Sequence, residues 1–150
     1  MSVVFGANRL EELVRRVSGL VFDKSDLQRL SDLVDDKLYD LLLVGVQHAS
    51  YNNRDLIMEP DLPLTRGLRE NMEDFALYEE ELEVAPILED LTSYPMLERE
   101  PSQEVIDLLP ELGGTLIVVT TQLITVMEPD VSNPTAETWE RVIEAMDLLI

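Results

Sequence analysis

The sequence predicts an all-α protein made of two halves that share one plan. Apolar residues recur every three or four positions in several segments, and Gly, Pro and Asn separate these segments. The segments are short, long and medium in length, and the same order returns roughly 75 residues later. A chain of 150 residues, 45% of them hydrophobic, is long enough to bury its own core.

The first half opens with a short amphipathic helix, predicted over residues 8–18. Leu and Val recur there at helical spacing, and Gly19 ends the helix. Residues 20–22, with the sequence LVF, follow as a short extended piece.

A long helix is predicted over residues 26–51. A capping box opens it, in which the Ser25 hydroxyl accepts a backbone N–H near Gln28 and the Gln28 side chain reaches back. Apolar residues hold one face of the helix, and Lys37 and Asp40 belong to the polar face. At 1.5 Å per residue the helix is roughly 40 Å long, so it constrains the fold more than its shorter neighbours do.

A third helix completes the first half. Asn52 and Asn53 favour a turn, and residues 56–58, with the sequence LIM, form a second extended piece. Pro60 is expected to open the helix at its first position, where the missing N–H costs nothing. The helix is then predicted to run to Leu82.

In the second half, a short helix is predicted over residues 85–91 and a long one over residues 102–127. Local signals conflict in the long one. Pro110 costs about 3 kcal/mol or kinks a helix, and the stretch TLIVVTTQLITV at 115–126 is β-branched and typical of a strand. The length of the apolar stretch and its lack of clean alternation favour the helix.

The last helix completes the repeat. Asn133 is expected to cap it and Pro134 to open it. Its apolar face carries Trp139, Val142, Ile143, Met146 and Leu149.

The chain is strongly acidic, with a formal net charge of −20. Residues 1–75 hold 9 Lys and Arg against 14 Asp and Glu, a net of −5, whereas residues 76–150 hold 2 against 17, a net of −15. DNA, RNA and anionic lipid would be repelled, so basic proteins or cations are the expected partners. The alternative is that the acidity only keeps the protein soluble.

Cysteine is absent from the sequence, which fits a reducing cytoplasm and argues against a disulfide framework or a thiolate metal site. The first residues, MSVVFGANRLEEL, lack a basic start, so a secretory signal is not expected. We found no apolar run approaching the roughly 20 residues that a membrane span needs. We therefore expect a cytoplasmic protein.

The stretch VFDKSDLQRLSDLVDDKLYDLLLVGVQHASYNNRDLIMEPDLPL resembles archaeal histones. It has a Val in the first loop, an acidic start to the long helix, a His near the end of that helix, and then Arg54 and Asp61 at an Arg–x6–Asp spacing. Together with LPLTRGLRENMEDF, PILEDLTSYP and NPTAETWERVIEAMDLL, it is similar to a small bacterial family of uncharacterised proteins that carry two histone folds in one chain.

The resemblance implies tandem histone folds, each of short, long and short helices, that pack on each other as an intramolecular pseudo-dimer in one compact domain. The first fold would cover residues 1–78, and the second, degenerate fold would cover residues 79–150. Fusion would make the pairing of the halves independent of protein concentration. The two long helices would cross through Leu30, Val34, Leu41, Leu116, Val119 and Leu123.

In such a pseudo-dimer the extended pieces would find partners. Residues 20–22 would pair with the loop around Val131, and residues 56–58 with the loop around Met96 and Leu97. Two short parallel bridges of this kind would satisfy backbone groups that the helices cannot reach.

The resemblance also implies a pair between Arg54 and Asp61, which would lock the second loop against a helix. The alternative is an unpaired surface Arg beside an unrelated Asp at a helix start. In the second half, one alignment places Val131 and Thr138 at the matching positions, and another places Glu128 at the position of the Arg. Neither alignment restores the pair.

The residue pattern contains no catalytic constellation, so we expect neither an enzyme nor a cofactor. His48, the only histidine, is expected to be structural at a helix end. The acidic runs at residues 79–83 and 98–104 could hold Mg²⁺ or Ca²⁺ loosely, but a solvated charged face is the simpler interpretation. The edge that could contact nucleic acid consists of Arg9, Arg15, Arg16, Lys24 and Arg29.

The leading functional hypothesis is a protein-interaction module of the histone dimerisation type that does not wrap DNA and that presents its acidic face to a basic partner. One alternative is a weak DNA-binding, nucleoid-associated histone-like protein. Another is a carboxylate-based metal-binding protein or enzyme. Pseudo-dimers could also assemble into homo-oligomers, which the sequence does not decide.

Overall fold

The computed structural model describes residues 3–91 and 94–150, and most of them are helical, which confirms the all-α prediction. The strands in this part of the chain are only two residues long. In chain order the elements are α1 (Val3–Ser18), α2 (Lys24–Tyr51), β1 (Leu56–Ile57), the 3₁₀ turn η1 (Glu59–Asp61), α3 (Arg66–Leu82), α4 (Ala85–Leu91), β2 (Glu100–Pro101), α5 (Gln103–Met127) and α6 (Ala136–Leu149).

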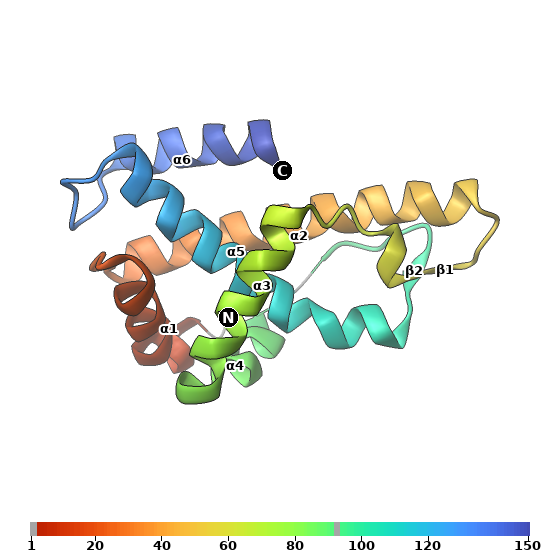
Figure 1. Cartoon of the computed structure of the whole chain (residues 1–150), viewed down its shortest axis with the longest axis horizontal. Helices are drawn as coiled ribbons and strands as arrows, with labels where there is room; N and C mark the ends of the chain where they lie inside the picture. The colour runs from red at the N-terminus through yellow and green to blue at the C-terminus, as the bar shows by residue number, and fades with distance from the viewer. Residues whose placement is uncertain (1–2, 92–93) are drawn as a thin grey trace.

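The two long helices, α2 and α5, cross at the centre of the molecule (Figure 1). Gly113 of α5 faces α2 at this crossing. A Cβ at that position would lie 3.9 Å from the side chains of Val34 and Leu38 of α2. Of the residues expected at the crossing, Leu30, Val34, Leu41 and Leu116 are buried, and Val119 and Leu123 are partly buried.

At one end of the molecule, the loop that follows α1 meets the loop that follows α5. The Val21 N–H donates to the Ser132 carbonyl at 2.8 Å. This is the contact expected between residues 20–22 and the loop around Val131. Segments more than 100 residues apart are therefore joined through their backbones.

At the other end, β1 pairs with β2 in parallel, with Leu56 opposite Glu100 (Figure 1). The expected pairing of β1 with the loop around Met96 and Leu97 is wrong by a few residues. Leu97 is instead buried in the core, while Met96 is exposed. The strand forms further along the chain, directly before α5.

The start of α2 differs from the prediction in its cap. The Asp23 carboxylate accepts the Asp26 N–H at 2.8 Å, and the Asp26 carboxylate accepts the Asp23 N–H at 3.0 Å. The capping box predicted for Ser25 and Gln28 is therefore wrong, and the helix begins at Lys24. Two carboxylates at the N-terminus satisfy free N–H groups and also interact favourably with the helix dipole.

The start of α3 shows a break that the prediction missed. Pro60 lies in the turn η1, and Leu62 then has an extended backbone. The cause is Pro63, because a proline disfavours the helical conformation of the residue before it. The α-helix begins only at Arg66, with the Thr65 side chain as its cap.

Three other boundaries differ from expectation. α1 begins at Val3, five residues before the predicted start. Thr135 caps α6 through a capping box, in place of Asn133. The boundary expected between residues 78 and 79 lies inside α3, and the chain instead turns at Glu83, where φ is 51°. Buried side chains from both halves form one hydrophobic core.

α5 is a continuous helix, so the alternative of a strand over residues 115–126 is wrong. The Thr120 hydroxyl donates to the Leu116 carbonyl at 2.7 Å, and the Thr121 hydroxyl donates to the Ile117 carbonyl at 2.9 Å. These bonds satisfy polar groups inside the core. By length and composition α5 could cross a membrane, but 61% of its most apolar window is buried inside the molecule, as in a core helix.

Lys37 was expected on the polar face of α2, but it is 3% exposed. Its ammonium group donates to Asp40 of the same helix and to Asp147 in the last turn of α6. Burial alone would lower the pKa of Lys37, but the hydrogen bonds to Asp147 and Asp40 outweigh burial and raise it. The charge therefore ties α6 to α2.

Candidate functional site

The pair of Arg54 and Asp61 closes the loop between α2 and α3. Both terminal nitrogens of Arg54 donate to the Asp61 carboxylate, and the Met58 N–H donates to it at 2.7 Å. The hydrogen bonds from Arg54 hold the pKa of Asp61 below its ordinary value, although burial opposes this. His48 Nδ1 donates to the Asp61 carbonyl at 2.7 Å, so the histidine stabilises the same loop.

A different pair occupies the corresponding place in the second half. Asp61 and Thr138 hold the same position, the third residue after a cap. The Thr138 hydroxyl donates to the Glu128 carboxylate at 2.9 Å, and Arg141 lies 3.7 Å from that carboxylate. The two sequence alignments considered Glu128 and Thr138 separately and missed that they are partners. A hydrogen bond from Thr138 thus takes the place of the paired hydrogen bonds from Arg54.

The predicted nucleic-acid edge is largely engaged within the molecule. Lys24 and Arg29 are exposed, and they have no ion-pair partner among the residues that the structure describes. The three arginines of α1, in contrast, all bind groups of the same chain. These contacts are Arg9 with the Glu83 carbonyl, Arg15 with Glu12, and Arg16 with Glu12 and Glu81.

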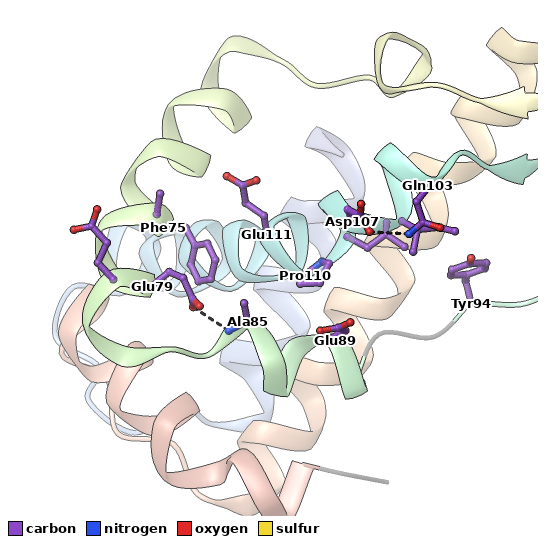
Figure 2. Close-up of a pocket in the computed structure, with 13 residues that line it drawn as sticks. Phe75, Glu79, Ala85, Glu89, Tyr94, Gln103, Asp107, Pro110 and Glu111 are labelled. Atoms are coloured by element: carbon purple, nitrogen blue, oxygen red, sulfur yellow. Dashed lines mark hydrogen bonds between the residues drawn. The ribbon is translucent and has the colours of Figure 1, made fainter.

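A groove of about 860 Å³ lies between α3, α4 and α5, and Figure 2 shows its lining. Its floor is apolar and includes Phe75, Leu109 and Pro110. Phe75 is held there because its ring lies directly on Gly114 of α5, where a Cβ would come within 2.1 Å of the ring. Pro110 has no N–H, so it cannot donate to the carbonyl of Ile106, another residue of the groove.

Two carboxylates of the groove have partners of their own. The Glu79 carboxylate accepts the Ala85 N–H at 2.9 Å and the Val84 N–H at 2.8 Å. These bonds fix the start of α4 (Figure 2). Asp107 accepts the Gln103 side-chain amide at 2.8 Å. Neither partner is a cation, so both carboxylates keep their negative charge unbalanced.

Three further carboxylates, those of Glu80, Glu89 and Glu111, have no hydrogen-bond or ion-pair partner in the described part of the chain. Burial, and then the charge of Glu59, raise the pKa of Glu111. None of the residues found to line the groove is basic. The groove is therefore apolar at its base and anionic at its rim, which favours a ligand with both apolar and cationic groups.

Metal ligands do not gather in the described residues, where no three His, Asp or Glu side chains lie close enough to hold an ion. In the acidic run at residues 79–83, Glu79 binds the start of α4, and Glu81 pairs with Arg16 of α1. Parts of this run therefore hold neighbouring helices in place.

The groove could not be recognised in the sequence. Taken alone, Pro110 predicts only a kinked or broken helix, and Phe75 and Glu111 do not stand out in the sequence. The groove is built from three helices, and the residues that form its floor come from both halves of the chain. The one signal that could have indicated it was a proline followed by two glycines inside an apolar helix that also carries acidic residues.

The family model described as "Domain of unknown function (DUF1931)" matches residues 10–147 of the chain. A crystal structure of a protein from Thermus thermophilus is similar, with 42% identity and a TM-score of 0.85 over 95% of this chain and 97% of that one. The crystal structure of protein AQ328 from Aquifex aeolicus has a TM-score of 0.84 at 22% identity, over 97% of this chain and 95% of that one, which shows a shared fold. The comparison with curated proteins found no match.

Proposed function

The chain belongs to the family of the domain of unknown function DUF1931, and from that premise we propose that it is a pair of histone folds in one chain that acts as a protein-interaction module and does not wrap DNA. The architecture supports the first part of this proposal. The helix order repeats, α2 crosses α5, and the loops meet at both ends of the crossing. A head-to-tail histone pair has the same plan.

The observation that carries the functional part is how the cations are used. Nine of the eleven Lys and Arg side chains bind a carboxylate or carbonyl of the same chain. A protein that wraps DNA gains affinity when free Lys and Arg displace counterions from phosphates. Here the free charge is negative, which favours a basic partner and disfavours DNA.

Two experiments test this function. In an electrophoretic shift assay with duplex DNA at low salt, we expect no complex at about tens of micromolar protein.

In a capture experiment with immobilised protein, we expect basic proteins to bind at low salt and to be released as salt rises. A DNA complex at micromolar concentration, or the absence of any salt-sensitive partner, would contradict the proposal.

Weak DNA binding is a second candidate, because Lys24 and Arg29 are exposed and have no partner in the described residues. Both lie near the end of the molecule where the loops after α1 and α5 meet. If this edge binds DNA, the double variant Lys24→Gln/Arg29→Gln abolishes any shift observed at low salt. A shift that survives the double variant would mean that DNA binds elsewhere.

A further inference from the structure

We propose that the groove between α3, α4 and α5 binds a short basic segment of a partner protein, in which an apolar side chain is flanked by Lys or Arg. This inference rests on the proposed interaction function and names the surface that carries it. Three features of the groove lead to it: the apolar floor, the rim carboxylates that have no partner in the described residues, and the lack of a basic residue among the described residues that line it.

The floor would receive the apolar side chain. Ile106 is 41% exposed and offers the accessible apolar surface, and the Phe75 ring and Leu109, which line the same groove, are nearly fully buried. The ring cannot retreat toward α5, because it already lies against the backbone at Gly114. The floor is therefore a firm apolar surface, on which a leucine or phenylalanine of the partner would lose contact with water.

The rim would receive the flanking cations. In Figure 2, Glu111 and Glu89 lie on either side of Pro110, and Asp107 lies nearer the start of α5. The side chains of Glu89 and Glu111 have no partner in the described residues, and burial makes the charge of Glu111 costly. A Lys or Arg placed beside Glu111 would offset that cost, since an opposite charge stabilises a desolvated carboxylate.

Charge complementarity selects a basic segment over the other occupants. A second copy of this chain carries its own net charge of −20 and would be repelled. Nucleic acid and anionic lipid would be repelled for the same reason. A bare metal ion would need converging ligands, which the described residues do not supply, and it would leave the apolar floor unused.

Fluorescence anisotropy of a labelled peptide probe, KKLFKK, measures binding to the site at low salt. The groove variant Glu89→Gln/Glu111→Gln should weaken binding about tenfold. The matched control Glu140→Gln/Glu144→Gln removes the same charge from exposed positions of α6 and should stay within about twofold. Ala76→Arg, which places a cation and bulk at the exposed groove wall, should abolish binding.

The apolar requirement has its own control. The probe KKGSKK keeps the four lysines without the apolar pair and should bind at least about tenfold more weakly than KKLFKK. Any one of three results would overturn the proposal. These are equal binding of the two probes, equal losses of binding in the groove and control variants, and binding of the polyamine spermidine that is as tight as that of KKLFKK.

The outcomes separate this site from the general function. If basic proteins bind the immobilised chain and Ala76→Arg leaves both that binding and the binding of KKLFKK unchanged, the interaction function stands and the groove assignment is wrong. If neither the probe nor any basic protein binds, both proposals are wrong.

Discussion

At the scale of single residues, the Asp61 carboxylate is the clearest case of a charge that needs its partner. Its side chain is 3% exposed, and it accepts hydrogen bonds from both terminal nitrogens of Arg54 and from the Met58 N–H. A carboxylate removed from water in this way is tolerated because donors replace the water. Removing Arg54 would leave a buried anion with one backbone donor.

We therefore predict that Arg54→Ala lowers the melting temperature at pH 7 by several degrees, and by more than Arg99→Ala does. Arg99 also bonds to this loop, through the Arg54 carbonyl at 2.9 Å, but its carboxylate partner Asp55 is fully exposed at 3.4 Å. Losing Arg99 leaves no buried charge behind. Thermal unfolding followed by circular dichroism measures both variants, and equal effects would mean that the Arg54 pair contributes no extra stability.

The acid dependence of the same variant checks the cause. The pKa of Asp61 is lowered in the folded protein, so the unfolded state binds its proton more readily. The stabilisation is complete above the unfolded pKa of about 3.9 and is lost as pH falls through the lowered folded pKa. The difference between wild type and Arg54→Ala should therefore shrink in acid, and a constant difference would point to lost packing instead.

At the scale of elements, α5 depends on two adjacent glycines for different reasons. A Cβ at Gly114 would come within 2.1 Å of the Phe75 ring of α3, whereas a Cβ at Gly113 would meet α2 at an ordinary 3.9 Å. Only Gly114 is therefore required by packing. Gly113 still weakens the helix relative to alanine, because glycine loses more backbone freedom when it becomes helical.

We predict that Gly114→Ala costs about 3 kcal/mol of unfolding free energy, because Phe75 would have to leave its place in a packed core. Gly113→Ala should be neutral or should stabilise by up to about 1 kcal/mol. Urea unfolding at equilibrium measures both. Adding Phe75→Leu to Gly114→Ala should recover part of the loss, and a harmless Gly114→Ala would mean that the ring can move freely.

Most elements could be predicted because their signals are local. The periodic apolar positions of α2 and the long apolar stretch of α5 gave helices within two residues of those observed. The errors arose where one local rule overrode another. Asp23 caps α2 in place of the predicted Ser25, and its negative charge also interacts favourably with the helix dipole. Pro63 imposed an extended Leu62 where Pro60 suggested a helix start.

Contacts between distant segments could not be predicted in the same way. Lys37 looks like a surface residue in the sequence, and its partner Asp147 lies 110 positions away. The buried Asp26 carboxylate likewise accepts the Trp139 indole N–H at 2.9 Å across 113 positions. The groove has the same origin, since its floor joins α3 of one half to α5 of the other. Periodicity reveals which face is buried, but it does not reveal what covers it.

At the scale of the whole molecule, the dominant feature is an excess of negative charge on a shared core. The formal net charge is −20, and most cations are already paired internally. Self-repulsion of this size favours the expanded, unfolded chain, although the same charge keeps the molecules apart in solution. The fold is therefore stabilised by burial across the two halves and opposed by its own surface.

This balance predicts that salt stabilises the protein. Raising ionic strength from about 0.01 M to about 0.15 M shortens the Debye length from about 30 Å to about 8 Å. Repulsion between exposed carboxylates is then screened strongly, whereas the attraction within the buried Arg54–Asp61 pair is screened less. The melting temperature measured by calorimetry in sodium chloride should rise over this range. The Glu140→Gln/Glu144→Gln variant, with less repulsion to screen, should show a smaller rise. A melting temperature that falls with salt would mean that the internal ion pairs outweigh the surface repulsion, and that the acidic exterior imposes no cost on the fold.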